Sequence, residues 1–264
     1  MSETTHAGST RQVDEHALHL SILSSPAGTA WAVHRMATGR CIALHQMDVG
    51  DHWDHPDMPE DPRSISFITL PEWSTMVPES ALAPGSEADH LALVHGGIPT
   101  GAMRDEPIES LSARCIFVHD DVAERALLER FPAARPLSLQ ALMVRVAQAR
   151  SEKEPLLLVH RSKGRCDIAV ASGASILLSN GYPAITASDL LYFTLLAAER
   201  TGHAPHTVAL HYGGEHLTDA ETALLQKYFA RARPAIGHDH FAGGKAVKHP
   251  ERWMALVEQY TCAS

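Results

Sequence analysis

Two short segments rich in histidine and aspartate could bind a metal ion. One spans residues 48–63 and includes His52 and His55, and the other is His238-Asp239-His240. Imidazole and carboxylate groups are ligands that zinc and similar cations accept. The spacing matches no specific metal-binding template, and prolines interrupt the first segment, whereas a metal site needs rigidly held ligands. Because the chain has 18 histidines, close pairs arise by chance. We therefore predict no metal site and interpret 48–63 as an acidic surface loop.

No nucleophile stands in a recognisable catalytic setting. The chain has no Gly-x-Ser-x-Gly motif, and Cys115 and Cys166 lie in apolar segments without an adjacent base in the sequence. His95-Gly96-Gly97 is similar to the oxyanion glycines of esterases, but no elbow serine accompanies it. The sequence therefore predicts no catalytic residue. It also predicts that all the cysteines are reduced, because Cys41, Cys115, Cys166 and Cys262 are far apart and form no Cys-x-x-Cys pair.

The composition is that of an ordinary globular protein. Hydrophobic residues make up 45% of the 264 residues, charged residues make up 20%, and the formal net charge is -9. Lysine and arginine are scattered, so nucleic acid is not an expected partner. The longest apolar stretch, 190–198, is about half of the ~18 residues that a membrane span needs. The start of the chain has no apolar segment typical of a secretory signal. We expect a cytoplasmic protein without a membrane span.

The elements that must position any site contain a repeated pattern of turns. Gly28 and Gly39 separate three extended segments in the first half, and Gly164 and Gly173 separate three in the second. These segments are 18–25, 30–36 and 40–47, and then 156–161, 165–171 and 175–180. Corresponding glycines are 136 and 134 residues apart. This spacing predicts an internal duplication in which each copy opens with a three-stranded antiparallel meander.

Hydrophobic spacing and capping residues predict the remaining elements. Strands are expected at 64–70, 91–95, 114–119 and 207–212. Helices are expected from Asp120 or Asp121 to 130, at 137–150 with Ser138 as its cap, from a Ser188 cap to about 201, at 219–231 and at 250–260. The segment 73–82, which Pro78 interrupts, is expected to hold a short helix or an irregular connection.

These elements predict a mixed α/β protein of two lobes. The second half reads β-β-β-α-β-α. Residues 1–17 are expected to be a disordered tail. The first lobe is predicted at 18–152 and includes the acidic loop 48–63, and the second is predicted at 153–264 and includes the C-terminal helix.

The duplicated unit resembles the ribonuclease H-like unit that actin and the sugar kinases carry in tandem. More specifically, the chain resembles an uncharacterised bacterial family, known mainly from Bacteroidetes, that is assigned an actin-like ATPase fold. The motifs that carry the resemblance are Val77-Pro78 and Leu82, Ile116-Phe117-Val118, Phe131-Pro132, the hairpin 156–171, Asp189-Leu190-Leu191-Tyr192-Phe193 and Cys262. The resemblance covers about residues 20–262.

In the actin-like superfamily, the first turn of each lobe reads Asp-x-Gly. The glycine lets backbone amides approach the phosphates, and the carboxylate orders Mg²⁺ or its waters. Here the corresponding turns are Pro26-Ala27-Gly28-Thr29 and Ser162-Lys163-Gly164-Arg165. Pro26 and Ser162 therefore stand where the resemblance implies acids. Loss of both carboxylates should remove most metal-assisted phosphoryl transfer.

The resemblance implies a vestigial nucleotide site rather than an active one. Its residues would be Gly28, Thr29, Lys163, Gly164, and the adenosine-binding pair Gly213 and Gly214. We therefore expect a non-catalytic scaffold that binds a protein partner and needs no cofactor. One alternative is an ATP-binding protein or ATPase that holds Mg²⁺ with other acids, such as Asp167 or Asp189. Another is a metal-dependent hydrolase built on the His/Asp loops.

Overall fold

Two five-stranded sheets with the same topology form the body of the molecule. The computed structural model describes residues 17–47, 53, 55–97, 100–242 and 247–262. The first sheet has the order β3-β2-β1-β4-β8, and the second has the order β11-β10-β9-β12-β13. Their strands are β1 (Leu18–Ser25), β2 (Gly28–Arg35), β3 (Cys41–Met47), β4 (Ser64–Thr69), β8 (Arg135–Pro136), β9 (Leu156–Ser162), β10 (Arg165–Ser172), β11 (Ser175–Pro183), β12 (Ala209–Gly213) and β13 (Ala232–Pro234). In each sheet the first three strands form an antiparallel meander, and the last two add in parallel. The predicted duplication is confirmed.

The glycine turns are the local reason for both meanders. Gly28, Gly39, Gly164 and Gly173 have φ angles of 122°, 67°, 71° and 57°. Residues with side chains rarely adopt these angles, so glycine fixes where each hairpin turns. Between the turns, each strand can then place apolar side chains toward the interior.

Four of the helices begin at side-chain caps. In the first half, Asp120 caps α2 (Asp121–Arg130) and Ser138 caps α3 (Leu139–Arg150), as predicted. In the second half, Thr186 rather than Ser188 caps α4 (Ala187–Arg200), because Thr186 and Asp189 form a capping box. Thr218 caps α5 (Asp219–Tyr228). The prediction of this helix to residue 231 was too long, because buried Phe229 turns the chain into an extended path toward β13.

A third sheet is inserted into the first half, and here one prediction was incomplete and another was wrong. It contains β5 (Trp73–Pro78), β6 (Met103–Ile108) and β7 (Ala113–Val118) in the order β5-β7-β6. The segment 73–82 contains the expected short helix, the 3-10 helix η2 (Glu79–Ala81), but also the strand β5, which was not expected. Pro78 is compatible with this strand because it is the last residue of β5, an edge strand of the sheet, where a missing amide is tolerated. The predicted strand at 91–95 is the end of α1 (Glu87–His95), of which only Leu91 is buried. A short apolar run does not distinguish a strand from a helix.

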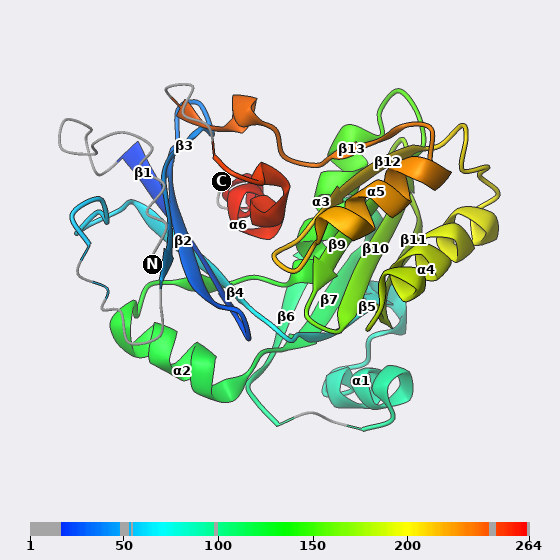
Figure 1. The fold of residues 1–264 in the computed structure, drawn as a ribbon. Coiled ribbons are helices and arrows are strands. Elements are labelled where there is room, and N and C mark those ends of the chain that lie inside the picture. Colours follow the sequence, from blue (N-terminus) through cyan, green and yellow to red (C-terminus); the bar gives the residue numbers. More distant parts are fainter. Residues whose placement is uncertain (1–16, 48–52, 54, 98–99, 243–246, 263–264) are drawn as a thin grey trace.

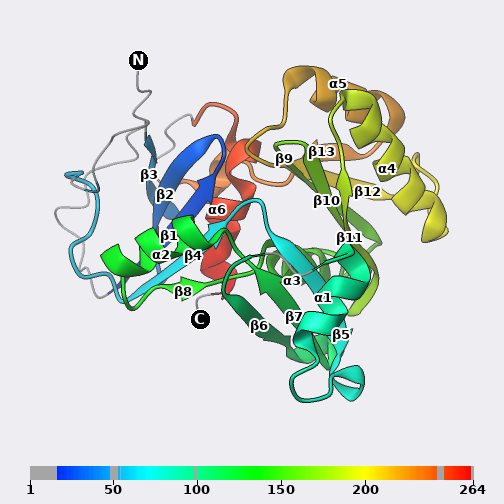
Figure 2. The same cartoon turned by 90° about the horizontal axis from the view of Figure 1, so that it is seen from below.

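Each half contributes a helix that packs on the sheet of the other half. In the chain α3 follows β8, and α6 (Met254–Glu258) comes after β13, between the short 3-10 helices η6 (Pro250–Trp253) and η7 (Gln259–Cys262). Helix α3 packs against β9, β10 and β11, whereas α6 packs against β1, β2 and α3. Figure 1 shows α6 between the two large sheets. Figure 2 shows the inserted sheet and α1 at one side of this body. The halves therefore share one central core.

The remaining expectations concern loops and membrane crossing. Residues 1–16 and part of the acidic loop lie outside the described residues, and the described part of 48–63 contains no helix or strand. The division at 152/153 stays a prediction. In the described chain, helices fall short of the length and apolar character that a membrane crossing requires. All four cysteines are buried and free of disulfides.

Candidate functional site

The two hairpins that carry the repeated turns meet at a small cavity between the halves. Pro26 from the β1–β2 hairpin lines this cavity of about 60 Å³ together with Ser162 and Lys163 from the β9–β10 hairpin. Pro26 and Ser162 are the residues that stand where the actin-like pattern has acids. The fold brings both positions to one place, and neither supplies a carboxylate there.

The side chain of Glu72 also lines this cavity, but its carboxylate is already bound by the protein. Its oxygens accept hydrogen bonds from Ser138 Oγ at 2.9 Å and from the amides of Leu139 and Gln140 at 2.7 and 3.3 Å. These donors form the start of α3, and a helix N-terminus is a natural anion site because its amides point outward. Glu72 thus acts as an internal anion at α3.

His119 links Glu72 to a second buried acid. Its Nε2 lies 3.5 Å from Glu72 Oε2, and its Nδ1 lies 3.0 Å from Glu124 Oε2. Burial alone would raise the pKa of Glu72, but the hydrogen bond and charge of His119 and the amide of Leu139 hold that pKa below its usual value. Burial likewise opposes the charge on His119, yet Glu124 and Glu72 raise the pKa of its imidazole. The cluster is a closed network of paired charges.

Both alternative metal ligands have partners inside the protein. Asp167 lines the small cavity, where its Oδ1 accepts a hydrogen bond from Arg165 Nε at 2.9 Å. Burial raises the pKa of Asp167, which the Arg165 charge opposes. Asp189 accepts hydrogen bonds from the amides of Ile185 and Thr186 at 3.0 and 2.8 Å, at the start of α4. The fold therefore uses the two carboxylates separately, one in an ion pair and one in a helix cap.

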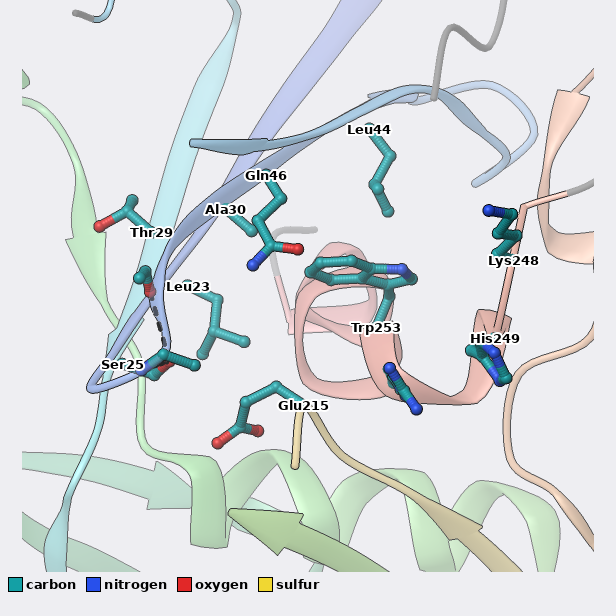
Figure 3. Close-up of a pocket in the computed structure, with 13 residues that line it drawn as sticks. Leu23, Ser25, Thr29, Ala30, Leu44, Gln46, Glu215, Lys248, His249 and Trp253 are labelled. Atoms are coloured by element: carbon teal, nitrogen blue, oxygen red, sulfur yellow. Dashed lines mark hydrogen bonds between the residues drawn. The ribbon is translucent and has the colours of Figure 1, made fainter. Parts of the chain in front are cut away.

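A larger cavity of about 370 Å³ opens at the β1–β2 hairpin. Gly28 and Thr29 line it, together with Gln46 of β3, Glu215 from the loop after β12, and Trp253 of η6. Figure 3 shows Glu215 reaching toward the tip of the hairpin, with Trp253 above it and Gln46 on the opposite wall. This cavity brings together residues from the first hairpin, from the loop after the Gly213-Gly214 pair and from the C-terminal segment.

Glu215 is buried without a full set of partners. Its side chain is 7% exposed, and both carboxylate oxygens lack a hydrogen-bond partner among the described residues. His160 Nε2 lies 3.5 Å from Glu215 Oε2, and Ser162 Oγ lies 3.3 Å from His160 Nδ1. Burial raises the pKa of Glu215 to about 7 and lowers the pKa of His160 to about 3. The Ser162 hydroxyl and the amide of Glu215 itself partly oppose this rise in the pKa of Glu215, but neither carboxylate oxygen has a hydrogen bond of ordinary geometry among the described residues.

Gly213 and Gly214 are covered by the protein's own backbone. A Cβ on Gly213 would lie 2.6 Å from the carbonyl oxygen of Glu251, and a Cβ on Gly214 would lie 2.3 Å from the amide nitrogen of Arg161. The Gly214 amide also donates to the Glu251 carbonyl at 3.0 Å. The glycines allow these segments to pack closely, and they do not present an open surface to adenosine. With the acids absent from both turns, the residues present do not fit Mg-ATP.

The His/Asp segments show no metal-binding geometry in the described residues. His52 and its neighbours Asp48, Asp51 and Asp54 lie outside those residues. His55 packs against His45, with ring centroids 4.3 Å apart. In the other segment, His240 Nδ1 lies 3.2 Å from Asp239 Oδ1. No group of three or more His, Cys, Asp or Glu side chains within the described ranges is placed to hold a metal ion.

Sequence reasoning missed two acids, Glu72 and Glu215, and also Arg252 of η6, which lines the larger cavity. Glu215 directly follows the Gly213-Gly214 pair, so its position beside a suspected ligand site was a usable signal. Glu72 and Arg252 carry no such signal. The position of Glu72 depends on its contact with the start of α3, and that of Arg252 on the return of the C-terminal segment to the β1–β2 hairpin.

Comparisons with known proteins agree with this architecture. The family model described as "Protein of unknown function (DUF3822)" matches residues 9–231. A Bacteroides thetaiotaomicron protein with actin-like ATPase fold and unknown function superposes with a TM-score of 0.73 and 16% identity, over 94% of this chain and 97% of that one. A chain of the PilM-PilN type IV pilus biogenesis complex superposes with a TM-score of 0.52 and 11% identity, over 92% and 98% of the two chains. Curated proteins show no significant sequence match. The chain therefore belongs to the DUF3822 family and has an actin-like ATPase fold of two lobes.

Proposed function

We propose that this protein is a non-catalytic scaffold that binds another protein and has a degenerate nucleotide site. The observation that carries the proposal is the convergence of Pro26 and Ser162 at one cavity, where the superfamily pattern has acids. Glu72 at the start of α3 and the Arg165–Asp167 pair support it, because they place paired protein charges where metal and phosphates would need room. A phosphate group brought next to Glu72 would meet a like charge.

The partner part of the proposal is an analogy with a protein of the same fold. The chain of the PilM-PilN complex comes from an assembly of two proteins, which shows that the fold can serve protein association. Fold alone does not transfer a partner. We place the protein in the cytoplasm, a location that its four free, buried cysteines support because oxidising compartments favour disulfides.

Titration with Mg-ATP tests the nucleotide part of the proposal. A ligand that binds the folded state raises the melting temperature progressively as its concentration exceeds its Kd, so a degenerate site should give no shift that grows with the Mg-ATP concentration. Lys163→Ala removes the cation at the small cavity, and Lys153→Ala is a matched change at another exposed lysine. A shift present in the native protein and in Lys153→Ala, but lost in Lys163→Ala, would identify a nucleotide-binding protein and overturn the scaffold proposal.

The partner is tested by purification of the tagged, full-length protein from its own cells. The proposal expects a co-purifying protein at a fixed stoichiometry, and the two purified proteins should then form a complex whose Kd is unchanged by Mg-ATP. A protein that remains alone and hydrolyses ATP would contradict the proposal. Zinc that co-purifies stoichiometrically and is lost on replacement of His52 and His55 would instead support a metal-dependent hydrolase.

A further inference from the structure

The larger cavity contains buried polar atoms whose hydrogen-bonding capacity the described residues do not fill. Both oxygens of Glu215 and the Nε of Arg252 have no hydrogen-bond partner within the described ranges, and both residues line this cavity. Buried polar atoms are almost always bonded to protein or to ordered water, because an unmade hydrogen bond leaves the loss of hydration uncompensated. Two such groups in one cavity indicate a site built to receive polar groups from a ligand.

The two ends of the cavity differ in charge. Glu215 reaches toward Ser25 at the tip of the β1–β2 hairpin, whereas Lys248 and His249 lie at the far end (Figure 3). Arg252 comes from the same C-terminal segment as these two residues. Lys248 and Arg252 are the cations of this segment, whereas His249 Nδ1 lies 3.4 Å from Glu251 Oε1 and 3.8 Å from Asp219 Oδ1. An arginine and a lysine in one cavity wall favour an anionic group, because guanidinium and ammonium groups bind phosphate and carboxylate well.

An apolar surface joins these ends. The Trp253 indole lies between Glu215 and Leu44 in Figure 3, and Leu23 adds to the same lining. A carbon skeleton can lie against this surface while its polar groups reach either end. The volume of about 370 Å³ is within the range of small-molecule sites, about 300–1,000 Å³.

We propose that this cavity binds a small polyol that carries an anionic group, with a sugar phosphate as the ligand chemistry. Ligand hydroxyls donate to the two oxygens of Glu215, the phosphate contacts Arg252 and Lys248, and the carbon skeleton packs on Trp253. A nucleobase has no place in this arrangement, because backbone atoms of Glu251 and Arg161 already cover Gly213 and Gly214. The ligand would bridge the β1–β2 hairpin, the loop after β12 and the C-terminal segment, so it would act on the scaffold as a bound effector.

The test uses ribose 5-phosphate as the probe, and ribose, inorganic phosphate and AMP as comparisons. We expect ribose 5-phosphate to change tryptophan fluorescence saturably, and to raise the melting temperature progressively at concentrations above the Kd that the fluorescence gives. Ribose and phosphate alone should bind at least tenfold more weakly, because each makes contacts at one end only. AMP should also bind at least tenfold more weakly because of its base.

Two variants test the residues themselves. Glu215→Gln keeps the size of the side chain, and Arg252→Gln removes the cation; each should weaken ribose 5-phosphate binding about tenfold or more. Glu199→Gln and Arg200→Gln are matched controls on the exposed end of α4 and should bind as the native protein does. Circular dichroism and the melting temperature of each variant without ligand establish that it is folded.

Several results would overturn this inference. They are the absence of a saturable fluorescence change with ribose 5-phosphate, a Kd that is unchanged in both cavity variants, or equal binding of inorganic phosphate. Equal binding of AMP would also contradict it and would reopen the nucleotide site. Failure of the scaffold proposal is a separate outcome, because other experiments test it. These are the Mg-ATP titration of the native and Lys163→Ala proteins and the purification of a protein partner.

Discussion

At the scale of single residues, the interior contains charges and imidazoles that the protein pairs or keeps neutral. Glu72 is 4% exposed, and Ser138, Leu139 and Gln140 donate to its carboxylate. No sequence motif marks this residue, because its function depends on contact with a helix start that lies more than sixty residues later. The glycine turns are different, because their conformational requirement is local and is visible in the sequence.

Replacement of Glu72 by alanine should strongly destabilise the protein. The change leaves the start of α3 without its anion and His119 without one of its two acids, so we expect a loss of about 3 kcal/mol in the free energy of unfolding. Urea unfolding measures this loss. Glu79→Ala, at an exposed position next to β5, is the control and should change stability by less than about 0.5 kcal/mol. Similar small effects of the two changes would contradict the role of Glu72.

His34 should make stability depend on pH. Burial, together with the charge of nearby His19, lowers the pKa of His34 from 6.5 to about 3 in the folded protein. The unfolded chain therefore binds a proton at about pH 6.5, whereas the folded protein does not, so the stabilisation is present above that pH and is lost as pH falls toward 3. Between pH 6.5 and pH 5, the titration of His34 alone should lower the free energy of unfolding by about 2 kcal/mol.

The measurement compares urea unfolding at pH 7 and pH 5. His34→Gln should lose less stability between these values than the native protein does, because the amide does not titrate. The ring of Tyr260 stacks on His34, and the ring of His19 lies close to both, at centroid distances of 6.1 Å from His34 and 6.2 Å from Tyr260. Burial lowers the pKa of His19 to about 4, so a variant with both His19→Gln and His34→Gln should show a further reduction in pH dependence. His206→Gln, at an exposed position, should follow the native protein. The same pH dependence in native and His34→Gln proteins would exclude this mechanism.

At the scale of elements, local signals predicted the repeated part of the fold, but in the insertion they predicted only one strand, β7. Both meanders follow from glycine turns and apolar alternation, and the caps at Asp120 and Ser138 follow from side chains that bond the first helical amides. The strand β5 was missed because a proline in a sequence is evidence against a strand. Proline is unfavourable inside a central strand, but Pro78 lies at the end of an edge strand, where it is tolerated. The helix α1 was missed because its short apolar run has no clear period.

The glycines of the repeat should differ in their tolerance of alanine. At Gly164 a Cβ meets open space, so the cost comes from the left-handed backbone alone, about 1 kcal/mol. At Gly39 a Cβ would lie 2.7 Å from the Tyr260 ring, so Gly39→Ala should cost at least twice as much. Urea unfolding of the two variants gives both values. An equal cost would mean that the contact between the β2–β3 turn and the C-terminal segment is not tight.

At the scale of the whole molecule, each half contributes one helix that packs on the sheet of the other half. We therefore expect the two halves to unfold as one cooperative unit. Leu142 of α3 and Leu256 of α6 lie in the same core as Leu23 of β1 and Leu158 of β9. The sequence predicted two lobes but not the shared core. An apolar helix face shows that the helix packs on a sheet, but it does not show which of the two sheets that is. The cavities at the hairpins have the same origin, since they are lined by segments far apart in the chain.

Leu142→Ala and Leu256→Ala should therefore weaken both halves to a similar extent. Each change removes a fully buried side chain and should cost about 2–5 kcal/mol. Because the core is shared, hydrogen exchange should accelerate in β1 and β2 and also in β9 and β10, whichever helix carries the substitution. Val122→Ala, whose side chain is 75% exposed on α2, should leave exchange in both sheets unchanged. Faster exchange in only one sheet would show that the halves open independently, in which case a ligand between them would have to act by closing the lobes rather than by filling a preformed cavity.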